Sequence, residues 1–301
     1  MNKEYRDQTQ QVINILPLIR HKDFALKGGT AINLFFRDLP RLSVDIDLTY
    51  LPLQDRKTTF QNIHTYLQTI SDVLEKKGFV CASDKPLDGK KEAKLVVNRN
   101  KVQVKIEPNF ILRGSAFAPS MQTLSTKVKR DFGDSYQFNC LSFEDIYGGK
   151  ICAALTRQHP RDLFDIRDLL DNEGITKDLK DAFIFYLISS PKPFIEILNP
   201  RKKTIDDVYR DKFLGMTTEN VSIRLLDNAF RELVEILYTS LTENDLEFLV
   251  SLLELKPKWQ LSPIENLPDY PSIKWRMLNI KKMDSFKRAL EIKKLKEFLN
   301  N

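Results

Sequence analysis

Two short segments near the start of the chain constrain its fold more than any other feature. The first is the glycine turn Gly28-Gly29-Thr30, which follows an apolar run at residues 24–26 and predicts a strand, a tight turn and a helix over residues 30–36. The second is Ser43-Val44-Asp45-Ile46-Asp47-Leu48, in which polar and apolar residues alternate as in a half-buried strand. Because strand side chains alternate in direction, we expect Asp45 and Asp47 on one face.

Both segments suit a nucleoside triphosphate. A turn that opens a helix offers uncovered backbone N–H groups and the positive end of the helix dipole to phosphate. Two carboxylates on one strand face can bind Mg²⁺, which prefers oxygen ligands and keeps substrate phosphate oxygens among them. Each segment also has an ordinary explanation, since such a turn is common as a helix cap and an exposed strand yields two acids by chance. Their succession, with Val44, Ile46 and Leu48 filling the opposite strand face, favours the functional interpretation.

A third acid lies on a later predicted strand. Residues 94–97 and 101–106 are strand-like and are separated by Asn98-Arg99-Asn100, which predicts a hairpin. In the second strand the phase places Glu107 with Lys105 rather than with the apolar residues. Glu107 would complete a two-metal site, which stabilises both the attacking and the leaving oxygens of an in-line displacement. An ordinary charge at the end of a strand explains Glu107 equally well.

Further charged residues lie on two helices predicted over residues 143–156 and 161–170. Lys150 and Arg157 lie two helical turns apart on one face, where both would meet phosphate. On the next helix, Arg161 and Asp165 have the i,i+4 spacing of an ion pair. Surface ion pairs explain this second helix as well as catalysis does.

The predicted elements indicate an α+β protein of two domains. Helices are also expected over residues 4–19 and 58–77, whereas from Ile175 onward strand signals nearly vanish and the pattern is mostly helical. We therefore place a soft boundary near Gly174. The first domain then comprises residues 1–174, and a helical domain comprises residues 175–301.

Charge is spread unevenly along the chain. The sequence has 47 basic and 41 acidic residues and a formal net charge of +6. Residues 270–301 contain nine Lys or Arg and three Asp or Glu, an excess of six, so the remainder is close to neutral. Such a basic terminus favours a polyanionic partner such as nucleic acid. A solvated helix surface explains it equally well.

Cysteine spacing and hydropathy exclude several classes of protein. Cys81, Cys140 and Cys152 are odd in number and lack the spacing of a zinc site, so we expect reduced thiols. The strongest apolar run, residues 182–188, is far shorter than the roughly 20 residues that a membrane helix requires. We therefore expect a cytoplasmic protein with no membrane partner. His21, His64 and His159 have no partners at ligand or triad spacing, so we assign them no catalytic role.

The order of these motifs resembles that of the AbiEii/AbiGii nucleotidyltransferase toxins, relatives of the MenT toxins and of the polymerase β-like fold. In that family a Gly-Gly-Ser/Thr turn precedes an acidic-hydrophobic-acidic strand, as the turn at Gly28 precedes Asp45 and Asp47 here. The family's lysine-bearing helix is similar to Tyr147-Gly148-Gly149-Lys150, and its Arg-Asp-x-x-Asp motif is similar to residues 161–165. The third acid departs from the pattern, because it is a glutamate where an aspartate is common.

The resemblance covers about residues 24–170. It implies a polymerase β-like nucleotidyltransferase domain, with a small mixed sheet flanked by helices, followed by a mostly helical domain. It also implies transfer of NMP from an NTP to an acceptor hydroxyl at the 3′ end of tRNA, with Mg²⁺ or Mn²⁺ as the cofactor. The enzyme would be the toxin of a toxin–antitoxin (abortive infection) system, restrained by an antitoxin that is commonly a DNA-binding regulator.

The residues expected in the site follow from the motifs and from the resemblance together. The catalytic residues are Asp45, Asp47, Lys150 and Asp165; the metal ligands are Asp45, Asp47 and Glu107; the NTP phosphates meet Gly28, Gly29, Thr30, Ser43, Lys150 and Arg157. Lys150 would neutralise charge on the departing pyrophosphate, and Asp165 would position Lys150 or the acceptor. The tRNA phosphates would meet Lys281, Lys282, Lys287, Arg288, Lys293 and Lys294.

Two other functions fit the same motifs. A nucleotide-sensing or interaction protein would keep the fold and transfer nothing, although the intact acids argue against it. A nucleotidyltransferase that modifies a protein hydroxyl or a small molecule would keep the chemistry and change the acceptor.

Overall fold

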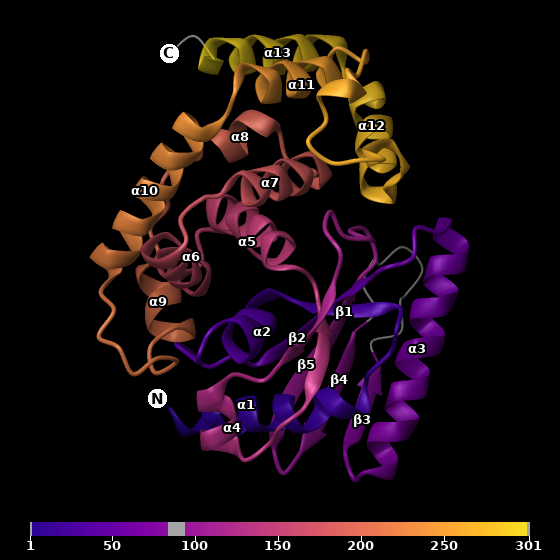
Figure 1. The fold of residues 1–301 in the computed structure, drawn as a ribbon, viewed down its shortest axis with the longest axis vertical. Helices are drawn as coiled ribbons and strands as arrows, with labels where there is room; N and C mark the ends of the chain where they lie inside the picture. Colours follow the sequence, from indigo (N-terminus) through magenta and orange to yellow (C-terminus); the bar gives the residue numbers. More distant parts are fainter. Residues whose placement is uncertain (1, 84–93, 300–301) are drawn as a thin grey trace. The chain divides into compact units, whose positions relative to one another are not determined.

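The computed structural model describes residues 2–83 and 94–299 of the chain, which fold into two compact units (Figure 1). Unit 1 comprises Met1–Ile146 and Phe213–Asn220, and unit 2 comprises Tyr147–Lys212 and Val221–Asn301. Gly174, where the sequence suggested a boundary, lies inside unit 2, and the two-domain division at that residue stays a prediction.

Unit 1 is built on a mixed sheet of seven strands in the order β3-β4-β5-β2-β1-β7-β6. The β2–β5 and β1–β7 pairs are parallel, and the other neighbours are antiparallel. The strands are β1 (Phe24–Lys27), β2 (Asp45–Tyr50), β3 (Val80–Ser83), β4 (Leu95–Arg99), β5 (Val102–Asn109), β6 (Ser120–Thr123) and β7 (Gln137–Cys140). The small mixed sheet flanked by helices is therefore confirmed.

The central strands are fixed by the alternation that the sequence predicts. In β2 the side chains of Ile46 and Leu48 are fully buried, whereas those of Asp45 and Asp47 are half-buried on the other face. The expected β4–β5 hairpin is present, but it turns through Asn100 and Lys101, both with positive φ, because Asn98 and Arg99 still pair as part of β4. Strands β3, β6 and β7 were not predicted, because each has only four residues and, unlike the equally short β1, none leads into a glycine turn.

Helices cover the sheet (Figure 1). Helix α1 (Lys3–Ile15) packs against β5, α3 (Arg56–Lys76) against β3, and α2 (Gly28–Ala31) against β2. The single helix expected over residues 30–36 is in fact α2 followed by a π-helical stretch, Ile32–Phe36. The backbone N–H of Arg37 donates to the carbonyl of Ile32 at 2.7 Å, which closes the wider π-turn.

A late segment of the chain completes unit 1. Residues 213–220 return to the strand region after a long excursion through unit 2. The N–H of Leu42 donates to the carbonyl of Met216 at 2.7 Å, and Arg41 forms an isolated β-bridge with Thr217. The residues just before β2 are thus held by a part of the chain more than 170 positions away.

The regular elements of unit 2 are all helices in the part that the structure describes, as expected. Helices α5 (Phe143–Arg157), which begins in unit 1, and α6 (Pro160–Asn172) are separated by His159, whose imidazole accepts the N–H of Arg161 and caps α6. In Figure 1, α11 (Glu243–Leu253) and α13 (Ser285–Leu299) lie side by side. The remaining α-helices are α4 (Thr126–Phe132) of unit 1 and α7 (Lys177–Ser189), α8 (Phe194–Leu198), α9 (Asp206–Lys212), α10 (Ile223–Ser240) and α12 (Pro271–Lys282) of unit 2.

None of the helices in the described residues is both long and apolar enough to span a lipid bilayer.

Candidate active site

The register of β2 and β5 brings the predicted carboxylates together. These strands are parallel, and Asp47 lies opposite Glu107 while Asp45 lies opposite Lys105. Neighbouring strands lie about 5 Å apart, so three carboxylates and one ammonium group share a small area of one sheet face. The strand phase deduced from the sequence places all four side chains as expected.

The glycine turn lies directly against this acidic face. Gly28 has a φ of +71°, which a side chain would disfavour. A Cβ built on Gly28 would lie 2.6 Å from Oδ2 of Asp47. Only a glycine therefore lets the turn approach the carboxylate this closely, and the turn and the acid pair form one structure.

Hydroxyl groups connect the turn to the start of β2. The hydroxyls of Thr30 and Ser43 lie 2.9 Å apart, and the Thr30 hydroxyl also donates to the backbone carbonyl of Asp45. The amide of Asn33 donates to the carbonyl of Gly29 at 2.8 Å. Thr30 and Ser43 are both buried, so their hydroxyls hold the turn against the start of β2.

Arg41 is a buried arginine behind the turn that sequence reasoning missed. Its side chain is only 2% exposed, and a Cβ on Gly29 would lie 2.6 Å from its Nη2 and 3.3 Å from the Ser43 hydroxyl. The guanidinium donates to the carbonyl of Leu42 at 3.0 Å. No short sequence motif predicts that this arginine is buried, because its position depends on the fold of residues 28–43.

Negative charges repel one another on the acidic face. Partial burial raises the pKa of Glu107, and the charges of Asp47 and Asp45 raise it further, against an opposing effect of Lys105 and Lys94. Like charges at this separation repel, and a cation between them relieves the repulsion. The face therefore favours a bound cation.

A divalent metal is the cation that the donors fit. Carboxylate oxygens on a half-buried strand face are ligands for a hard ion such as Mg²⁺, which takes one or two carboxylates and completes its shell with water and phosphate oxygens. In residues 2–83 and 94–299, no group of three or more His, Cys, Asp and Glu side chains is arranged to hold a metal ion. Asp45 and Asp47 thus fit as a two-carboxylate platform rather than as a closed protein cage.

The other predicted residues form a second cluster, within unit 2. Nζ of Lys150 lies 3.0 Å from Oδ1 of Asp162 and 3.0 Å from Oδ2 of Asp165. Arg157 pairs with the same Asp162 through Nε at 2.5 Å and Nη2 at 3.1 Å. Lys150, Asp162 and Asp165 are at most 7% exposed, so the lysine is held rigidly between two carboxylates on α6.

Asp162 joins the two basic residues, and sequence reasoning assigned it no role. Burial alone would raise the pKa of Asp162, but Lys150 and Arg157 outweigh burial and hold it well below its usual range. Asp162 and Asp165 are three positions apart and so share a helix face. That spacing was the available signal.

A close helix contact supports this lysine. A Cβ on Gly148 would lie 2.9 Å from the backbone carbon of Ala182 and 3.0 Å from the backbone nitrogen of Phe183. Helices α5 and α7 therefore touch at Gly148, one turn or less before Lys150.

The expected site residues thus fall into two sets. Unit 1 brings together Gly28, Gly29, Thr30, Ser43, Asp45, Asp47 and Glu107, and unit 2 brings together Lys150, Arg157 and Asp165. The basic residues of the tail lie on α12 and α13.

A family model decides which proteins this chain is related to. The model described as "Nucleotidyl transferase AbiEii toxin, Type IV TA system" matches residues 18–259, most of the chain. The chain belongs to the AbiEii family. It is a nucleotidyl transfer enzyme of a toxin family, and the toxin of a type IV toxin–antitoxin system implies an NTP substrate and an antitoxin partner.

The fold is similar to that of a solved toxin structure. MenT4, a nucleotidyltransferase toxin from Mycobacterium tuberculosis, superimposes with a TM-score of 0.61 at 12% identity, covering 93% of this chain and 95% of MenT4. A protein from H. pylori, solved as a candidate nucleotidyltransferase, gives a TM-score of 0.47 at 16% identity, covering 79% of this chain and 95% of its own. No curated protein matches this AbiEii chain in sequence.

Proposed function

We propose that this AbiEii protein transfers a nucleoside monophosphate from an NTP to the 3′ hydroxyl of tRNA, using Mg²⁺ held by Asp45 and Asp47. The observation that carries the proposal is the close approach of the Gly28 backbone to the Asp47 carboxylate, which leaves no room for a Cβ. A turn that suits phosphate and a carboxylate that suits Mg²⁺ meet at one point, where a metal-bound triphosphate would lie.

Each residue near the turn has a defined part in this reaction. The first N–H groups of α2 have no partner within the helix and would donate to phosphate oxygens. Ser43 and Thr30 hold the turn against β2, and Glu107 adds a third carboxylate beside Asp47. When bound, Mg²⁺ or Mn²⁺ supplies positive charge to the phosphates and to the reacting oxygens.

The bond changes are those of an in-line displacement. The acceptor oxygen forms a bond with the α-phosphorus and gives its proton to solvent water, while the bond from that phosphorus to the bridging oxygen breaks and pyrophosphate leaves. We assign Lys150 to the charge that develops on pyrophosphate. Asp165 and Asp162 hold the Lys150 ammonium group in one place, and Arg157 adds a second positive charge for phosphate.

tRNA is proposed as the acceptor because of charge. The excess of six positive charges in residues 270–301 suits a polyanion better than a small neutral acceptor. We assign the tRNA phosphate contacts to the basic residues of α12 and α13 named in the sequence analysis: Lys281, Lys282, Lys287, Arg288, Lys293 and Lys294.

Labelled NTPs test the proposal directly. The purified chain is incubated with tRNA, Mg²⁺ and each α-labelled NTP, and label is followed into RNA and into protein. We expect labelled tRNA from the unchanged chain and at least a roughly 100-fold loss in Asp45→Asn and Asp47→Asn. Asp7→Asn, an exposed aspartate on α1, is the matched control and should label normally.

Two results would overturn the proposal. Label in protein but not in RNA would move the acceptor to a protein hydroxyl. NTP binding without any labelled product would leave a nucleotide-binding protein that transfers nothing.

A further inference from the structure

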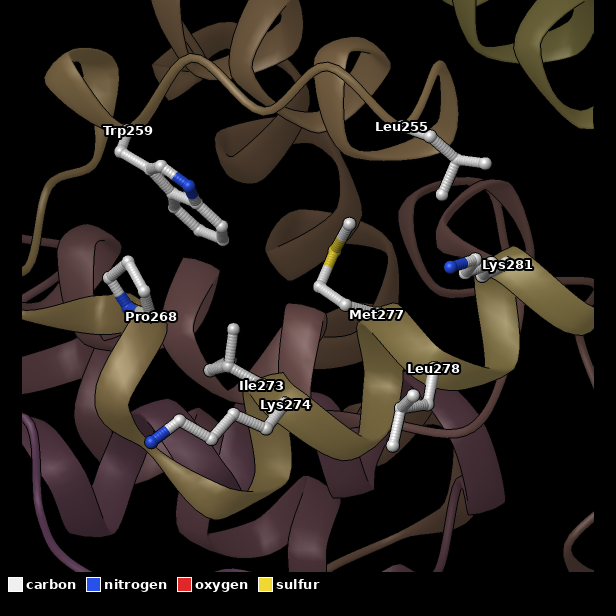
Figure 2. Close-up of a pocket in the computed structure, with 8 residues that line it drawn as sticks. All are labelled: Leu255, Trp259, Pro268, Ile273, Lys274, Met277, Leu278 and Lys281. Carbon is white, nitrogen blue, oxygen red and sulfur yellow. The ribbon is translucent and has the colours of Figure 1, made fainter.

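Unit 2 contains a cavity that takes no part in the proposed reaction (Figure 2). Its volume is about 570 Å³, and its walls come from α12 and from the segment between α11 and α12. The lining residues are Leu255, Trp259, Pro268, Ile273, Lys274, Met277, Leu278 and Lys281.

The cavity wall is apolar and includes one aromatic ring. Figure 2 shows the indole of Trp259 extending into the cavity, toward the side chains of Met277 and Ile273. The indole is anchored by an edge-to-face contact with Phe248, with ring centroids 6.0 Å apart. Trp259 is thus a fixed aromatic surface that remains partly exposed.

Lysines stand at the edges of the same cavity. Lys274 and Lys281 are two turns apart on α12, and in Figure 2 they lie at opposite ends of the cavity. Both are exposed, and Lys274 forms an exposed ion pair with Asp269 at 3.6 Å. Exposed lysines continue beyond Lys281 at Lys282 and Lys287.

An exposed apolar residue lies at the edge of the cavity. Leu278, on the cavity edge, is 56% exposed. An aromatic surface in an apolar cavity with cations at its edges is the arrangement by which proteins hold unpaired bases, since the base stacks and the lysines contact the flanking phosphates. Charge selects this ligand over an apolar protein segment, because the α12–α13 region carries an excess of six positive charges.

We propose that this cavity binds an unpaired nucleotide of a single-stranded RNA segment, with the base against Trp259 and the adjacent phosphates at Lys274 and Lys281. The proposal rests on the RNA acceptor of the proposed function and adds a second contact to it, made by unit 2. It would let the enzyme recognise a strand by an exposed base as well as by its charge.

Intrinsic fluorescence can test this contact, because the chain has two tryptophans, Trp259 and Trp275. In Trp275→Phe, the remaining emission reports on Trp259. The full chain is titrated with a mixed-sequence single-stranded oligoribonucleotide and with an abasic oligonucleotide of the same length and charge. We expect the oligoribonucleotide to quench Trp259 and to bind more tightly than the abasic strand.

Substitutions then separate stacking from charge. Trp259→Ala should weaken oligoribonucleotide binding by roughly 5- to 100-fold and leave abasic binding unchanged, whereas Lys274→Ala should weaken both. Phe286→Ala removes an aromatic ring that is 77% exposed and lies outside the cavity, and it should change neither. Leu278→Asp, at an exposed position, should weaken oligoribonucleotide binding even if Trp259→Ala fails to fold.

Several outcomes would overturn the inference. Equal binding of the oligoribonucleotide and the abasic strand, or no quenching of Trp259, would show that no base binds in the cavity. Quenching by an acidic amphipathic peptide but by neither strand would assign the cavity to a protein partner. The binding assay needs no NTP, so the two proposals can fail separately. If Trp259→Ala weakens oligoribonucleotide binding but the unchanged chain transfers no nucleotide, only the proposed function is wrong. If the chain transfers nucleotide to RNA and Trp259→Ala leaves that transfer unchanged, only this inference is wrong.

Discussion

Gly28 is the residue at which backbone conformation and charge are most tightly linked. Its φ is +71°, and a Cβ at this position would lie 2.6 Å from the Asp47 carboxylate, so Gly28→Ala has both a strained backbone and a displaced carboxylate. We expect the free energy of unfolding to fall by about 1–2 kcal/mol. Nucleotide transfer should fall by roughly 100-fold, since small displacements of reacting groups cost that much.

Gly78→Ala is the matched control for this change. Gly78 has a φ of +82°, but a Cβ there meets nothing within 4 Å. It should lose a similar stability in urea denaturation and keep full transfer activity. Equal activity losses in the two variants would show that backbone strain, rather than the contact with Asp47, is what matters.

The ion pairs of Asp162 predict how the stability of the chain depends on pH. Breaking a buried ion pair costs about 3–5 kcal/mol, so Asp162→Asn should lower the free energy of unfolding by that order at pH 7. The pKa of Asp162 is depressed in the folded chain, so its stabilisation is complete above the unfolded value of about 4 and is lost as pH falls toward the folded value.

The measurement is urea denaturation of both proteins from pH 7 down to pH 3. The difference in free energy of unfolding between the unchanged chain and Asp162→Asn should become smaller below about pH 4. Asp178→Asn, at an exposed aspartate of α7, should differ little from the unchanged chain at every pH. A gap that stays constant to pH 3 would contradict the assignment of the ion pair.

At the scale of elements, α5 contains two adjacent glycines with different surroundings. Gly148→Ala would place a methyl group against the backbone of α7, which cannot move cheaply, so we expect a loss of about 1–3 kcal/mol. At Gly149 the nearest atom to an added Cβ is a ring carbon of Tyr186 at 3.4 Å, an ordinary contact. Gly149→Ala should therefore gain up to about 1 kcal/mol from helix propensity. Thermal unfolding of the two variants checks the contrast, which equal shifts would contradict.

Elements with a strong period could be predicted from the sequence. The alternation around Asp45 and the turn at Asn100 placed β2, β4 and β5, and the parallel register of β2 and β5 sets Asp47 beside Glu107. The helix that bears Lys150 was predicted to within a residue. These elements follow from local patterns, because burial on one face repeats along each of them.

Other features depend on contacts that no local pattern contains. The π-helical stretch after α2 and the buried Arg41 depend on how residues 28–43 fold back on β2. Asp162 was missed because its partners lie on another helix, and the cavity at Trp259 because its walls come from separate segments. Tertiary packing decides each of these.

For the whole molecule, net charge predicts how RNA binding depends on salt. The logarithm of the binding constant should fall linearly with the logarithm of salt concentration, and each lost phosphate contact should reduce the slope by about 0.7 for a single strand. Replacing Lys281 and Lys282 together with alanine should therefore reduce it by about 1.4. Lys296→Ala is the control, because Lys296 already pairs with Glu254 at 2.9 Å. Fluorescence anisotropy of a labelled oligoribonucleotide measures the slopes, and an unchanged slope in the double variant would remove these lysines from the interface.

The return of residues 213–220 to unit 1 has a consequence for how the enzyme is made. The backbone just before β2 is tied to Met216 and Thr217, so a nascent chain that has emerged only as far as Gly174 lacks the partners of Arg41 and Leu42. A ribosome must therefore deliver more than two thirds of the polypeptide before the catalytic scaffold can close, and a prematurely terminated toxin should be harmless to the cell that produced it.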